Sequence, residues 1–89
     1  MLHDMMYAHP FTVLAEPTRL QILNELRDSD RHVGHLIEAL GLTQPMISKH
    51  LKVLRDAGWI AGIVSGPAVN YCLHEPNIAW FKAKVGEIF

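Results

Sequence analysis

Residues 33–57 read VGHLIEALGLTQPMISKHLKVLRDA, and their pattern predicts two helices joined by a tight turn. In the first half, apolar side chains recur at the i, i+3, i+4 and i+7 spacing of one helix face, at Val33, Leu36, Ile37 and Leu40. Gly41 follows, where a left-handed helix cap is expected. Thr43 suits the N-cap of the second helix, with Pro45 in its first turn. The stretch therefore predicts a helix-turn-helix.

The sequence after this motif predicts a β-hairpin and a last helix. Beyond Gly58 the apolar period changes from about 3.6 to 2, in two stretches, 59–64 and 68–73, that are rich in Ile, Val and Tyr. Ser-Gly-Pro lies between them as a turn. Residues 77–89 then return to helical spacing. A hairpin placed directly after the second helix makes this motif a winged helix-turn-helix.

Two shorter helical segments precede residue 33. The first follows Pro10, and the second starts at Pro17 and runs through about Asp28. We therefore predict a mostly α-helical fold with a small β-hairpin. In it, residues 33–57 are the helix-turn-helix, 59–73 the wing and 77–89 the C-terminal helix.

Length and composition limit the class of protein. A chain of 89 residues predicts one domain, residues 1–89. The formal net charge of −1 excludes a uniformly basic protein, but a nucleic-acid binder needs only a locally positive face. One cysteine excludes a disulfide framework and a zinc site made of several cysteines. No membrane span or signal-peptide pattern is present, so we expect a cytoplasmic protein with no membrane partner.

The second helix of the motif carries the candidate DNA-binding residues. A recognition helix presents its N-terminal turns to the major groove, where Gln44 can pair with adenine. Three cations less one aspartate give residues 43–58 a charge of +2 in a chain of −1. The alternative is an ordinary solvated helix face. The candidates are Thr43, Gln44, Pro45, Met46, Ser48, Lys49, His50, Lys52 and Arg55.

Three stretches together resemble the ArsR/SmtB family of bacterial winged-helix repressors. They are AEPTRLQIL at 15–23, LIEALGLTQ at 36–44 and SKHLKVLRDAG at 48–58, within a similarity that covers about residues 11–73. Glu16 stands where the family usually has Asp. The resemblance implies a homodimer that occupies a double-stranded DNA operator and blocks transcription until a signal releases it. It also implies that the first and last helices form the dimer interface.

Apolar residues near both chain ends agree with such a dimer, because they exceed what a small core needs. Paired across a two-fold axis, they would be buried and would set two recognition helices roughly 34 Å apart. The alternative is that they cover the core of their own chain. The dimerisation candidates are Phe11, Trp80, Phe81, Val85 and Ile88, accompanied by Met5, Met6, Tyr7 and Phe89.

The residues that hold metals in many members of this family are missing. Many members bind metals through a Cys-x-Cys pair at the start of the third helix. In this sequence the two aligned positions are His32 and Gly34, and Gly34 has no ligand atom. His32 and His35 can share a helix face and form part of a zinc or nickel site, or they are simply polar surface positions. In the last helix only Glu87 is a possible ligand. We therefore expect no metal and no cofactor, and the inducer stays unknown.

The wing also departs from the family pattern, in which arginines surround the hairpin turn. Residues 60–73 contain neither Lys nor Arg. Because phosphate contacts give DNA binding its salt dependence, we expect a shallow dependence and weak binding at physiological salt. Arg19, Arg27 and Arg31 can compensate if they face the DNA backbone. Cys72, in the second strand, is interpreted as a packed residue rather than a redox sensor.

Three functions are weighed on this sequence. The first is a dimeric DNA-binding transcription regulator, which the resemblance implies is a repressor. The second is a winged-helix module that binds proteins, which the neutral wing favours. The third is a repressor that responds to zinc or nickel through histidines. An enzyme is not expected, because the sequence has no Gly-rich phosphate loop, no clustered pair of carboxylates and no nucleophile placed beside a base. Ser48, Lys49 and His50 are consecutive, so on a helix they point about 100° apart and do not converge.

Overall fold

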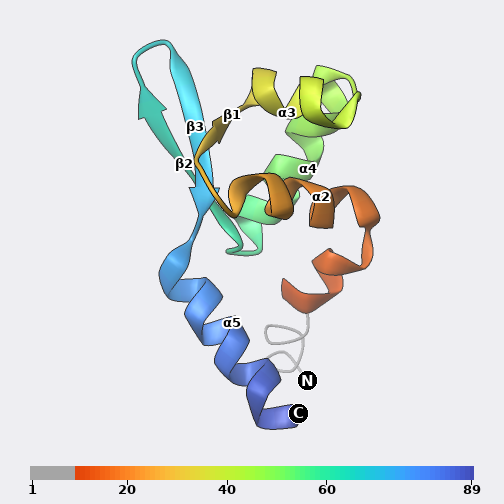
Figure 1. Cartoon of the computed structure of the whole chain (residues 1–89), viewed down its shortest axis with the longest axis vertical. Helices are drawn as coiled ribbons and strands as arrows, with labels where there is room; N and C mark the ends of the chain where they lie inside the picture. The colour runs from red at the N-terminus through yellow and green to blue at the C-terminus, as the bar shows by residue number, and fades with distance from the viewer. Residues whose placement is uncertain (1–9) are drawn as a thin grey trace.

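The computed structural model describes residues 10–89, so the predictions for Met5, Met6 and Tyr7 lie outside the described part. Residues 10–12 are helical and lead into the 3-10 helix η1. Figure 1 shows α2, α3 and α4 grouped beside the sheet, while α5 extends away alongside the N-terminal segment. The elements in chain order are η1 (Val13–Ala15), α2 (Pro17–Leu26), β1 (Arg31–His32), α3 (Val33–Leu40), α4 (Gln44–Asp56), β2 (Ile60–Ser65), β3 (Ala68–Leu73) and α5 (Glu75–Ile88).

Helix ends follow the local signals in the sequence. Gly41 has φ +67° after α3, and the Thr43 hydroxyl accepts a hydrogen bond from the backbone of Met46 at the start of α4. Both caps were predicted and are confirmed. Helix α2 ends at Leu26, two residues earlier than predicted, because the polar residues that follow bend the chain toward β1.

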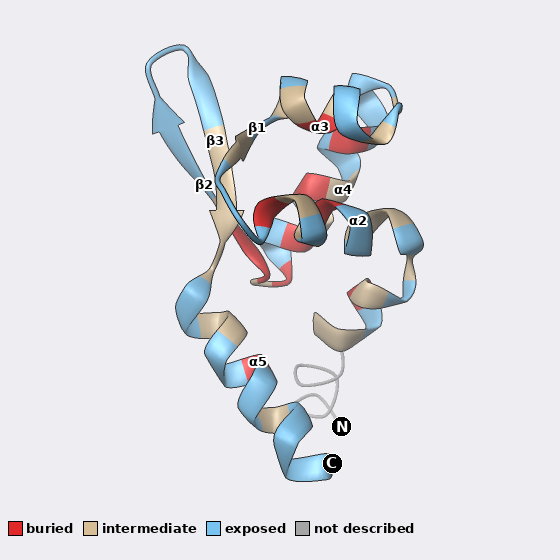
Figure 2. Ribbon diagram, in the orientation of Figure 1, coloured by how far each residue is buried: buried red, intermediate tan, exposed pale blue. Residues whose placement is uncertain are grey.

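The core lies where α2, α3 and α4 meet the base of the sheet, as the red segments in Figure 2 show. On α4, Ile47, Leu51 and Leu54 are buried at the i, i+4 and i+7 positions of one face. Ile47 is buried on this face, whereas its neighbour Met46 is 46% exposed. The fully buried large side chains are Ile22, Leu36, Ile47, Leu51, Leu54 and Ile60.

The predicted hairpin is present and gains a third strand. Strands β2 and β3 pair antiparallel from Ile60↔Leu73 to Ser65↔Ala68, with the turn at Gly66, whose φ is +62°. The two residues of β1 pair with the other side of β3, giving the order β1-β3-β2. Two residues are too few to show a period, so β1 was not predicted.

Helix α5 begins at Glu75, two residues before the predicted start. The reason is His74, whose Nδ1 accepts a hydrogen bond from the Asn77 backbone at 3.3 Å and caps the helix. Phe81 is the buried residue of α5, and its ring lies 4.1 Å from that of Trp59. Within residues 10–89, no helix is long and apolar enough to cross a membrane.

Phe81 differs from the other dimerisation candidates on α5. Its side chain is 6% exposed and packs inside its own chain, with the Phe11 ring edge-on at 5.5 Å. For this residue the alternative reading, that it covers the core of its own chain, fits the structure better. Trp80, Val85 and Ile88 are exposed, so they retain surface for a partner.

Candidate nucleic-acid interface

Helix α4 presents the candidate DNA-binding residues on its outer face. All of them except His50 are exposed: Thr43, Gln44, Pro45, Met46, Ser48, Lys49, Lys52 and Arg55. The opposite face, with Ile47, Leu51 and Leu54, is anchored in the core. The same helix therefore combines a rigid apolar anchor with an accessible polar surface.

The exposed N-terminal end of α4 suits an anionic or base-edge partner. The first-turn amides of a helix lack partners within the helix and carry partial positive charge. The Thr43 hydroxyl accepts from the Met46 amide at 3.4 Å and keeps its own proton for another acceptor. Within residues 10–89, the Gln44 side chain makes no hydrogen bond, so its amide group is available to a base.

The positive charge of α4 is partly neutralised by the helix itself. Lys52 Nζ lies 2.7 Å from Asp56 Oδ2, and Arg55 Nε lies 3.9 Å from Asp56 Oδ1. The hydrogen bond from Lys52 is the main cause that lowers the pKa of Asp56. Within the described part of the chain, Lys49 forms no ion pair. Lys49 is therefore the cation most available to a phosphate.

We predict that Asp56→Asn strengthens DNA binding and makes it more salt-dependent. The change releases Lys52 from its ion pair, so each α4 can neutralise one more phosphate. The slope of log affinity against log salt concentration is then expected to steepen by about 0.9 per α4. Titrations at several salt concentrations measure this slope. Glu87→Gln is the matched control, since Glu87 is also exposed and its partner is Lys84 of α5, which is not a candidate DNA-binding residue. Equal slopes for the two variants would contradict the prediction.

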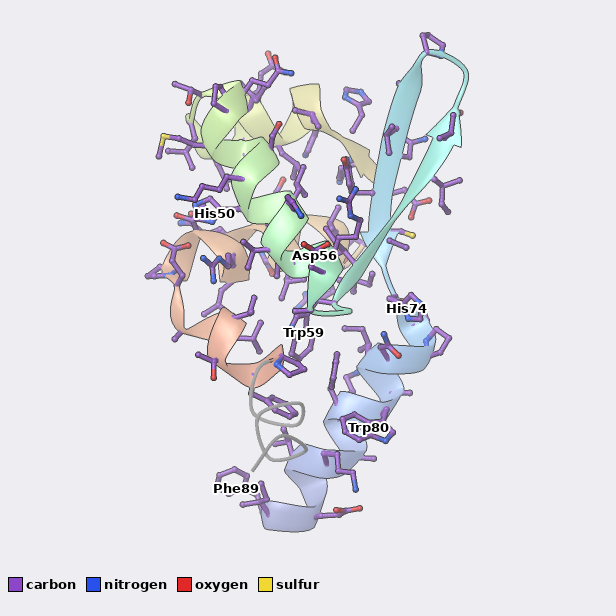
Figure 3. All side chains as sticks on the ribbon, turned by 180° about the vertical axis from the view of Figure 1, so that it is seen from behind. His50, Asp56, Trp59, His74, Trp80 and Phe89 are labelled. Carbon is purple, nitrogen blue, oxygen red and sulfur yellow. The ribbon has the colours of Figure 1, made fainter. Side chains whose placement is uncertain are left out.

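His50 turns inward, unlike its neighbours on α4. Figure 3 shows its ring between α4 and the chain around the start of α2. The Arg19 Nε donates a hydrogen bond to His50 Nδ1 at 3.3 Å, and Glu16 Oε2 lies 3.7 Å from the same atom. Only 15% of the His50 side chain is exposed. His50 was predicted as a DNA-binding residue from its place on α4, but in the structure its contacts are with Arg19 and Glu16 of its own chain.

Glu16 belongs to the same cluster. Burial alone would raise the pKa of its carboxyl. Hydrogen bonds from the Thr18 and Arg19 amides outweigh burial and lower that pKa. The carboxylate also caps α2 by accepting from the Arg19 amide at 3.1 Å. The sequence did not predict this cluster, because Arg19 and His50 lie 31 residues apart.

The wing is neutral and partly apolar at its tip, which projects from the body in Figure 1. Val64 is 77% exposed and Val69 is 37% exposed, and the two face each other across the hairpin.

Three arginines were expected to replace the missing cations of the wing if they face the DNA backbone. Two of them are directed to protein groups instead. Arg19 Nη1 donates to the Val13 carbonyl, and Arg31 Nε donates to the Glu25 carbonyl. Arg27 remains largely exposed.

The histidines considered as metal ligands make protein contacts. His32 Nδ1 accepts from the His35 amide at 3.3 Å and caps α3. His35 Nε2 lies 2.9 Å from Glu25 Oε1 of α2. Among residues 10–89, no group of three or more His, Cys, Asp or Glu side chains is placed to hold a metal ion.

Cys72 lies in β3 with its Sγ 3.8 Å from the Ala61 carbonyl. Burial, reinforced by the charge of Asp30, raises the pKa of its thiol. A raised pKa leaves little thiolate at neutral pH. This environment agrees with a packed strand residue.

Comparison with known proteins identifies the family. The profile described as "Bacterial regulatory protein, arsR family" matches residues 16–61, more than half of the chain. The chain belongs to the ArsR family. Among relatives, the HTH-type transcriptional repressor SmtB of Mycobacterium tuberculosis is 44% identical over 66 residues, which are 74% of this chain and 49% of SmtB. A probable mercury resistance operon repressor of Streptomyces lividans is 32% identical over 77 residues, 86% of this chain and 62% of that protein. This ArsR-family chain thus spans about half to three fifths of the length of these relatives.

Solved structures confirm the predicted fold. The crystal structure of Rv0081 from M. tuberculosis has a TM-score of 0.79 and 36% identity, covering 98% of this chain and 87% of that one. The solution structure of a homodimeric winged helix-turn-helix DNA-binding domain from Mycobacterium bovis has a TM-score of 0.81 and 28% identity, covering 98% and 80%. That protein is described as a possible ArsR-family transcriptional regulator. The winged helix-turn-helix and the family predicted by resemblance are therefore confirmed, and the names of these relatives are those of regulators rather than enzymes.

Proposed function

We propose that this ArsR-family chain binds a double-stranded DNA operator as a homodimer and represses transcription. The observation that carries the proposal is the outer face of α4, where Gln44 and Lys49 are exposed while Leu51 and Leu54 fix the helix in the core. Side chains held on a rigid helix can be presented to base edges and phosphates with little loss of freedom. The relatives named as transcriptional repressors support this proposal.

The proposed dimer forms through α5 and the N-terminal segment, residues 10–15. Trp80 and Val85 are 40% and 41% exposed, and Ile88 is 76% exposed, so α5 carries an apolar surface along its length. A groove of about 310 Å³ beside it is lined mainly by apolar side chains, including Phe11 and Leu14. A two-fold partner would cover these surfaces. The M. bovis structure, which is described as homodimeric, supports this assembly.

The proposal assigns no metal to this regulator. Gly34 supplies no ligand, and His32 and His35 are held by the contacts described above. We propose that release from DNA follows a signal other than a thiolate-bound metal.

The second candidate function is a winged helix that binds another protein. One observation favours it: Val64 and Val69 form an exposed apolar pair on a wing without cations.

Selection of bound fragments from genomic DNA tests this function. The expected result is enrichment of a near-palindromic sequence, bound by two copies of the chain. Recovery of fragments without a common sequence, or of none, would favour the protein-binding function.

Titration of the purified complex with Zn²⁺ and Ni²⁺ tests the metal part of the proposal. The expected result is unchanged operator affinity. A metal-dependent release that His32→Ala and His35→Ala both abolish would support the alternative of a histidine-based metal sensor.

A further inference from the structure

The Arg19 side chain joins the recognition helix to the N-terminal segment. Its Nε donates to His50 Nδ1 of α4 at 3.3 Å, and its Nη1 donates to the Val13 carbonyl of η1 at 3.2 Å. Both hydrogen bonds are partly buried. Arg19 lies in the first turn of α2, where the Glu16 carboxylate accepts from its backbone amide. One guanidinium therefore contacts two segments that the sequence separates by more than 30 residues.

The other end of the N-terminal segment is held against α5. Trp59 Nε1 donates to the Pro10 carbonyl at 2.7 Å. The Phe11 ring lies edge-on to Trp59 at 6.0 Å and to Phe81 of α5 at 5.5 Å. Residues 10–15 thus touch the aromatic cluster at one end and, through Arg19, the recognition helix at the other. In Figure 3, His50 and Trp59 mark these two ends.

We propose that the Arg19–His50 hydrogen bond is a positioning contact that sets the orientation of α4 relative to the dimer surface. This inference rests on the proposed function, because the two recognition helices of a dimer must meet successive major grooves roughly 34 Å apart. A small rotation of each α4 changes which half-site spacing fits best. His50 would then determine the spacing that the protein accepts, without touching DNA.

The contact requires a hydrogen-bond acceptor in the side chain at position 50. The guanidinium only donates, so His50 must offer an unprotonated Nδ1 as acceptor. Asparagine carries its Oδ1 at the same number of bonds from Cβ as Nδ1 of histidine. His50→Asn can therefore keep the hydrogen bond, whereas His50→Leu keeps a similar volume without an acceptor. Arg19→Met removes the donors from the other side and retains an unbranched side chain.

The test measures the affinity of full-length variants for the selected operator and for duplexes whose half-site spacing is changed by one or two base pairs. At the native spacing, His50→Leu and Arg19→Met are each expected to lose about ten-fold in affinity, the loss that results when only about a tenth of the molecules hold α4 in the orientation that fits both half-sites. Their preference for the native spacing should also flatten. His50→Asn should keep both the affinity and the preference. The double variant His50→Leu with Arg19→Met should lose no more than Arg19→Met alone, because Arg19→Met already removes the hydrogen bond to His50 together with the one to the Val13 carbonyl.

Lys49→Ala is the matched control on the same helix. Lys49 is exposed beside His50, and its loss is expected to weaken binding equally at every spacing and to reduce the salt dependence. His50→Leu should leave the salt dependence unchanged. A His50→Leu variant that loses affinity equally at every spacing would overturn the proposal. So would a His50→Asn variant that behaves like His50→Leu.

A measurement without DNA separates this inference from the proposed function. The imidazole ¹⁵N spectrum of the native chain should show Nδ1 of His50 as an unprotonated acceptor, with the proton on Nε2. Arg19→Met should change that spectrum, since the donor is lost. An unchanged spectrum would disprove the contact even if operator binding is found. A changed spectrum in a chain that binds no duplex would leave the contact in place and reject the function.

Discussion

Replacing Gln44 and Lys49 together by alanine is expected to abolish most of the preference for the operator. A glutamine that pairs with adenine contributes about 1–3 kcal/mol of discrimination. A dimer loses this contribution at both half-sites, so the loss in affinity is roughly thirty-fold to twenty-thousand-fold. Lys49 adds one phosphate contact per half-site, and its loss should reduce the salt slope by about 0.9 for each copy. Titration of operator and random duplex at several salt concentrations separates these two effects.

The matched control for this experiment is Gln21→Ala. It removes one amide group from an exposed position of α2, outside the candidate DNA-binding residues. The control variant should bind the operator like the native chain. If the Gln44 and Lys49 variant also keeps its operator preference, then the outer face of α4 does not read DNA, and the proposed function is lost with it.

The order of elements follows from signals that lie within a few residues of each other. Gly41 and Thr43 predict the turn for local reasons. Gly41 adopts the positive φ of a helix C-cap because it has no Cβ, and the Thr43 hydroxyl caps the next helix. The change of apolar period after Gly58 predicts the hairpin for a similar local reason. The ion pair between Lys52 and Asp56 also has a sequence signal, because residues spaced i, i+4 lie on the same face of a helix.

Contacts between distant segments had no such signal. The hydrogen bond from Arg19 to His50 and the contact of His35 with Glu25 depend on how α2 packs against α4 and α3, and no periodicity encodes that packing. For the same reason His50 was grouped with the outward-facing residues of α4. Helical spacing places it at an edge between the buried and exposed faces, and only the position of Arg19 decides which way it turns.

Leu54→Ala is expected to destabilise the folded chain more than any other change considered. Leu54 is fully buried on the core face of α4, and a leucine-to-alanine change at such a site costs about 2–5 kcal/mol. A domain of this size has a total stability of roughly 4–13 kcal/mol, so the variant loses a large share of it. The melting temperature should fall by roughly 10–40 °C, measured by circular dichroism at a fixed concentration, because dimerisation contributes to stability.

Met46→Ala provides the comparison within the same helix. Met46 is 46% exposed, so its truncation leaves no closed cavity and is expected to change stability by less than about 1 kcal/mol. Comparing Leu54→Ala with Met46→Ala also separates an effect on the stability of the fold from an effect on DNA binding. At a temperature where Leu54→Ala is still folded, its operator affinity should approach that of the native chain, since Leu54 faces away from the exposed surface of α4. Equal destabilisation by the two variants would mean that α4 is not anchored through Leu54, and the rigid presentation of Gln44 and Lys49 would lose its structural basis.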